Sequence, residues 1–164
     1  MVLALECVIA CILFGFGIVI SVIKNRTFWL EEYSPAVQER FLKCNPEFVQ
    51  KPKGQRNGIR IVEKIIVCIL FLMILAGMVW FAGADSFMKG AAYSYIIWFV
   101  VNLFDALVLD LGILMYWKKV RLPGTEDMDA EYTSNKKKHL MDGIYGMLIG
   151  LPVCLLVGLV STLF

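Results

Sequence analysis

A long apolar stretch at residues 91–117 constrains this chain more than any other feature. It is long enough to cross a bilayer, because about 20 apolar residues of helix span the hydrocarbon core. It nevertheless contains Asn102, Asp105 and Asp110, and a charged Asp at the centre of a membrane helix costs about 2.5–3.5 kcal/mol of insertion free energy. We therefore expect other parts of the protein to compensate these polar groups.

Three further apolar stretches predict an all-α fold. They cover residues 2–23, 65–84 and 143–164. The chain has 164 residues, of which 59% are hydrophobic, and this is too apolar for a soluble domain of that size. We therefore expect one membrane domain over residues 1–164, a polytopic four-helix transmembrane bundle.

The basic residues predict how this bundle is oriented. Residues 24–64 and 118–142 hold fifteen of the sixteen Lys and Arg residues, and cytoplasmic loops of membrane proteins are enriched in these types. We expect both loops to be cytoplasmic, with four crossings of the plasma (cytoplasmic) membrane and both termini outside. The lipid bilayer is thus the expected partner, and a net charge of only +2 does not suggest nucleic-acid binding.

The first loop contains the signature of a short amphipathic helix. Ser34 can cap the helix, and Pro35 suits its first position. Val37, Phe41 and Leu42 then lie on one apolar face. We expect this helix to be interfacial, with that face on the membrane surface.

A polar stripe in the stretch at residues 91–117 is the first candidate site. At 3.6 residues per turn, Ser94, Trp98, Asn102 and Asp105 fall within about 80° of one another. They are candidates for a substrate or ion path. Asp105 would titrate protons or bind a cation together with Asn102; the alternative is a hydrogen-bonded Asp that fixes helix packing.

A second candidate site lies at the cytoplasmic rim. On an α-helix Asp110 projects about 140° away from Asp105, so we expect the two acids not to form a close pair. Asp110 can instead join Glu126, His139 and Asp142 in an acid/base or metal cluster. The alternative is a solvated, interfacial His139 at the start of the last span, and the sequence names no metal or cofactor.

Small residues spaced four apart predict where helices pack closely. We expect these stripes to meet each other or to form a homo-oligomer interface. The last span carries Gly146, Gly150, Cys154 and Gly158, and the first carries Cys7, Cys11 and Gly15.

Three functions remain open from the sequence. The first is an oligomeric transporter or channel that uses Asn102 and Asp105, with association supplying the wall that four helices lack. The second is a noncatalytic accessory or assembly subunit bound to a membrane-protein partner. The third is a membrane enzyme using the Asp/His cluster, against which stands the absence of HExxH, P-loop or Ser/His/Asp motifs. We rank transport first because Asp105 is costly to insert.

Overall fold

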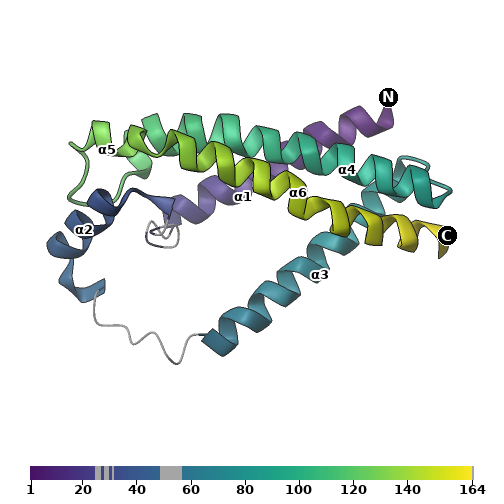
Figure 1. Cartoon of the computed structure of the whole chain (residues 1–164), viewed down its shortest axis with the longest axis horizontal. Helices are drawn as coiled ribbons and strands as arrows, with labels where there is room; N and C mark the ends of the chain where they lie inside the picture. Colours follow the sequence, from purple (N-terminus) through teal and green to yellow (C-terminus); the bar gives the residue numbers. More distant parts are fainter. Residues whose placement is uncertain (25–26, 28–29, 31, 49–56, 164) are drawn as a thin grey trace. The chain divides into compact units, whose positions relative to one another are not determined.

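The computed structural model describes residues 1–24, 27, 30, 32–48 and 57–163, and for residues 57–65 and 67 it describes the backbone alone. All regular structure in these residues is helical (Figure 1), which confirms the predicted all-α class. The α-helices are α1 (Val2–Lys24), α2 (Pro35–Cys44), α3 (Asn57–Phe81), α4 (Phe87–Phe104), α5 (Asp129–Ser134) and α6 (Lys136–Val160). A π-helix, η3 (Asp105–Leu114), continues α4, and the short 3₁₀ helices are η2 (Pro46–Phe48), η4 (Lys118–Val120) and η5 (Ser161–Leu163).

Three helical runs in the described residues are long and apolar enough to cross a membrane. They are Val2–Lys24, Phe87–Leu114 and Asp129–Leu163, while α3 contributes a shorter apolar part, Cys68–Phe81. Large apolar side chains on all three runs are exposed, for example Leu13, Leu107 and Ile149 at 67%, 50% and 64%. Soluble proteins rarely expose so much apolar surface, so the helices agree with a location in a membrane.

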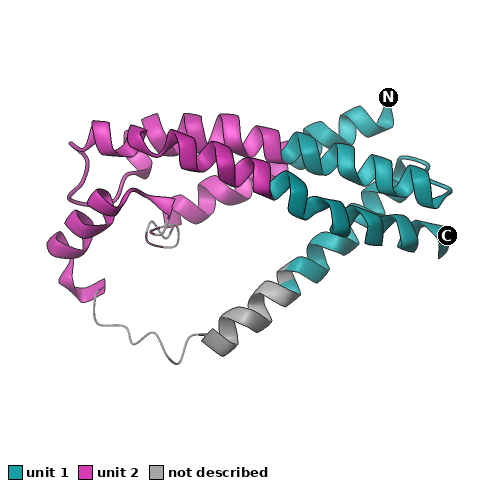
Figure 2. Ribbon diagram, viewed as in Figure 1, with its two compact units in different colours: residues 1–10, 51–101, 146–164 teal, residues 11–50, 102–145 magenta. Residues whose placement is uncertain are grey.

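The chain divides into two compact units (Figure 2). The first unit comprises residues 1–10, 51–101 and 146–164, and the second comprises residues 11–50 and 102–145. The first unit therefore holds α3 and most of α4, with one end each of α1 and α6. The second unit holds α2, η2, η3, η4 and α5, with the remaining parts of α1 and α6.

Small residues bring α4 and α6 together in the first unit. A Cβ atom added to Gly158 would stand 2.9 Å from the Phe87 carbonyl oxygen and 3.0 Å from the Ala91 Cβ atom. At Gly150 an added Cβ would collide with the Trp98 indole.

In the second unit, the Phe104 ring lies against Gly15, 2.9 Å from its ideal Cβ position. Gly150 and Gly158 of one predicted stripe, and Gly15 of the other, thus lie against the helical run Phe87–Leu114. Contact between the two stripes and a homo-oligomer interface stay predictions.

The helix predicted in the first loop is α2, and its beginning agrees with the sequence. Pro35 is its first residue, and the Ser34 hydroxyl accepts a hydrogen bond from the Val37 amide at 3.4 Å. Its apolar face, however, is covered by protein. Val37 and Phe41 are 0% and 1% exposed. They belong to a core cluster that also contains residues of the second loop. The second loop therefore covers the apolar face of α2, and an interfacial position of this helix stays a prediction.

The two loops together form a folded structure that we call the loop cap: α2, η2 and the chain from η4 through α5. Its core joins Tyr33, Val37 and Phe41 of the first loop to Leu122 and Tyr132 of the second. The Tyr132 hydroxyl accepts a hydrogen bond from the Leu122 amide at 2.9 Å, and its ring packs edge-on against Tyr33. Buried aromatic rings and satisfied polar groups make this cap a small core of its own.

Candidate functional site

The apolar helical run Phe87–Leu114 does not remain α-helical along its length. Its first part is α4, and from Asp105 to Leu114 the backbone is a π-helix of ten residues. Hydrogen bonds in a π-helix join residues five apart, and such segments are rare, usually one turn long, and frequent at functional sites. The costly acids Asp105 and Asp110 both lie in this segment.

The π-helix changes how the two acids relate. Asp105 and Asp110 are five residues apart, the spacing that a π-helical hydrogen bond joins, so they lie on the same side of the helix, as residues four apart do on an α-helix. Our expectation that Asp105 and Asp110 point about 140° apart is therefore wrong, because it assumed α-helical geometry for this segment.

Asp110 meets the single histidine of the chain. The His139 Nδ1 atom lies 3.2 Å from Asp110 Oδ2, and the two side chains are 7% and 21% exposed. One turn further along α6, an added Cβ atom at Gly143 would lie 3.1 Å from the Ala106 Cβ atom of η3. This close approach holds the first turns of α6 against the π-helix, so the alternative of a solvated His139 does not apply.

The other two rim candidates have different partners. Asp142 lies 3.6 Å from the Lys138 ammonium, which also pairs with Glu32 at 2.8 Å. Glu126 accepts a hydrogen bond from the Gly124 amide at 2.9 Å, within its own turn in the loop cap. Among the side chains that the structure describes, no group of three or more His, Cys, Asp or Glu residues could hold a metal ion. Of the predicted cluster, contact is seen between Asp110 and His139.

The deep polar stripe divides between the two units. In the first unit the Ser94 hydroxyl is fully buried, 3.3 Å from the Cys154 carbonyl oxygen, and the Trp98 indole donates to the Gly146 carbonyl oxygen at 3.0 Å. Both side chains thus connect α4 to α6, on the stripe of small residues. In the second unit Asn102 and Asp105 are partly buried.

Two further carboxylates, Glu32 and Glu6, have surroundings in the structure that the sequence pattern did not predict. Glu32 pairs with Lys138 of α6, a contact that its position among the charged residues of the first loop did not predict. Glu6 in the first unit is 8% exposed, and its Oε2 atom makes no hydrogen bond within the described part of the chain. The surrounding protein therefore covers this carboxyl group.

No protein-family model, curated protein or solved structure matches this chain. The chemistry of the site must therefore be argued from its own residues. Two carboxylates on one side of a helix, one of them in contact with an imidazole, can accept, hold and pass protons, because Asp and His side chains make up proton relays in membrane proteins. The arrangement is a candidate proton-transfer site.

Proposed function

We propose that this protein is a small membrane transporter or channel that moves protons, alone or together with a substrate, through Asp105 and Asp110. The observation that carries the proposal is the 3.2 Å contact of His139 with Asp110, one π-turn from Asp105 in an apolar helical run. Ionisable residues in membrane helices mark ion pathways and proton relays. Asn102, one turn before Asp105, lines the same path in this proposal.

We also propose four crossings, with both termini outside the plasma membrane. The fourth crossing would be α3, whose 25 residues extend about 37 Å at 1.5 Å per residue, more than the hydrocarbon thickness. The concentration of Lys and Arg in the two loops supports a cytoplasmic loop cap. Association between copies would use faces other than the stripe of Gly150 and Gly158, because α4 covers those glycines.

Proton flux into liposomes tests this function. The purified protein is reconstituted with a pH-sensitive dye inside, a pH gradient is imposed, and valinomycin with potassium balances the charge. We expect flux above that of protein-free liposomes and a fall of about tenfold or more in Asp105→Asn, since losing a proton-transfer group costs at least this much.

A matched variant separates this effect from general damage. Asp85→Asn changes an exposed carboxylate that pairs with Lys89 at 2.8 Å, and it should retain the flux of the unmodified protein. Equal flux in Asp105→Asn and Asp85→Asn, or flux no greater than that of empty liposomes, would rule out the proposed function.

A further inference from the structure

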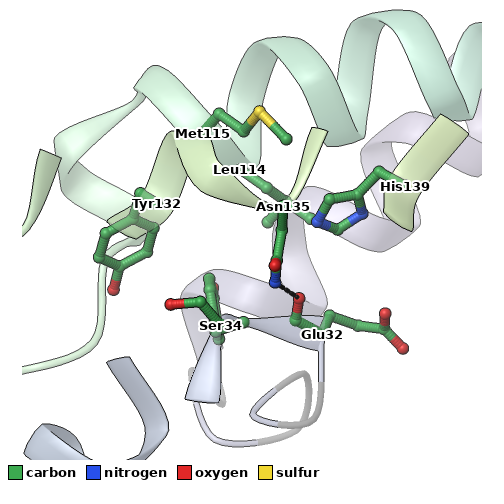
Figure 3. Close-up of a pocket in the computed structure, with 8 residues that line it drawn as sticks. Glu32, Ser34, Leu114, Met115, Tyr132, Asn135 and His139 are labelled. Carbon is green, nitrogen blue, oxygen red and sulfur yellow. Dashed lines mark hydrogen bonds between the residues drawn. The ribbon is translucent and has the colours of Figure 1, made fainter. Parts of the chain in front are cut away.

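A small cavity adjoins His139 on the side of the loop cap (Figure 3). Its volume is about 10 Å³, which is space for about one water molecule. Polar residues from three segments line it: Glu32 and Ser34 before α2, Tyr132 and Asn135 around α5, and His139 in α6. All of them belong to the second unit.

We propose that this cavity is a binding site for one water molecule, through which protons enter and leave His139 from the loop side. The role of this water in transport depends on the proposed function. Its presence and its exchange of protons with His139 do not, because they follow from the cavity alone.

The two nitrogen atoms of His139 have different surroundings. Nδ1 faces Asp110 at 3.2 Å, so His139 can offer Nε2 to a molecule in the cavity that it lines. The hydrogen bond made by one ring nitrogen sets the tautomer of the other. An Nδ1–H directed at Asp110 leaves Nε2 as a proton acceptor towards the cavity.

The cavity also contains further partners for a water, which needs two to four of them. The Ser34 hydroxyl accepts from the Val37 amide at 3.4 Å and keeps its own hydrogen to donate. The Asn135 side-chain amide makes a long bond of 3.5 Å to the Glu32 carbonyl oxygen, and its oxygen is an acceptor (Figure 3). The Tyr132 hydroxyl is already bonded to Leu122 and Thr125.

The proton step balances without any other reactant. The cavity water, when protonated, gives H⁺ to His139 Nε2, and His139 then gives the Nδ1 proton to the Asp110 carboxylate. The net result is one proton moved from the water to Asp110, with the imidazole again neutral but in its other tautomer. When the steps run in reverse, Asp110 returns its proton to Nδ1 and Nε2 releases its proton to the cavity water, which restores the first tautomer and lets a proton leave by the same route.

Charged groups surround this step from each neighbouring element. Asp110 faces His139 from η3, which also carries Asp105, and Glu32 lies before α2. Lys138 and Asp142 are on α6, and Lys138 pairs with Glu32 while their side chains are 44% and 39% exposed. The Glu32 carboxylate is therefore in contact with solvent and can collect protons for the cavity.

The single histidine makes a direct test available. The full chain, labelled with ¹⁵N-histidine, is placed in lipid bilayers, and transfer of magnetisation from water to the ring nitrogens is followed by solid-state NMR. We expect rapid transfer to Nε2. In Asn135→Leu, which removes a partner of the water, and in Asn135→Gln, which fills its space, transfer should be about tenfold slower, the equivalent of one lost hydrogen bond.

The control is a variant at a residue that does not line the cavity. Thr133→Val alters an exposed hydroxyl bonded within its own helix and should leave the transfer unchanged, and an intact Nδ1 signal shows that the Asp110 contact survives. Unchanged transfer in Asn135→Gln and Asn135→Leu would overturn the water site even if Asp105 controls flux. Slower transfer in both variants would support it even if liposomes show no flux.

Discussion

The two units of this protein hold their helices together by different means. In the first unit, α4 and α6 meet through Gly150 and Gly158, and the polar side chains of Ser94 and Trp98 both reach carbonyl oxygens of α6. In the second unit, ionisable groups of η3 and α6 meet, and a loop cap with its own core lies alongside them in the same unit. The contrast teaches that one polar stripe in a sequence can serve packing in one half and chemistry in the other.

The largest effect that we expect comes from the core of the loop cap. Phe41→Ala should lower the free energy of unfolding by about 3–5 kcal/mol, because the ring is 1% exposed and its removal leaves a cavity. Denaturant unfolding in detergent measures this. Phe16→Ala, at a site 68% exposed, should cost much less. Equal and small losses would mean that α2 rests on the membrane and not on the second loop.

Overpacking the first unit should have a smaller effect. Gly150→Ala places a methyl group where the Trp98 indole lies, so the ring must shift and lose its bond to Gly146. We expect a loss of about 1–3 kcal/mol in the free energy of unfolding. Gly77→Ala is the matched control, since nothing lies within 4 Å of its ideal Cβ position. If the two variants are equally stable, α6 does not pack on α4 as described.

The smallest effect should come from an exposed ion pair of the cap. A hydrogen bond from Arg40 lowers the pKa of Asp127 below its ordinary value. The pair therefore stabilises the fold above the unfolded-state pKa of about 3.9, and this contribution is lost as pH falls through the lower folded pKa. Thermal unfolding below about pH 4 should show a slight loss that Asp127→Asn removes. An unchanged acid profile in that variant would contradict the contribution of this pair.

Some of this structure can be predicted from the sequence because it depends on local signals. The apolar runs give the long helices, and Ser34 with Pro35 gives the start of α2. The partner of the α2 apolar face could not be predicted, because a membrane surface and a protein core require the same amphipathic pattern.

The sequence identified the residues of the candidate site but not their arrangement in space. The cost of burying acids identified Asp105 and Asp110. His139 was expected to contact Asp110 only if the start of its helix folded against the third apolar stretch. The π-helix that brings the acids onto one side has no comparable pattern in the residues 105–114, which resemble any apolar helix. Only the structure shows that the backbone hydrogen bonds of this segment join residues five apart and not four apart, and this spacing places the two acids on one side of the helix.

The central claim is that Asp105 and Asp110 act as one proton-transferring unit. Proton flux in liposomes, compared among Asp105→Asn, Asp110→Asn and the double variant, tests it most directly. If the two acids work in series, each single variant should lose about tenfold or more, and the double variant should lose no more than the worse single one, as for residues that act together. Losses that multiply in the double variant, or full flux in either single variant, would contradict the claim.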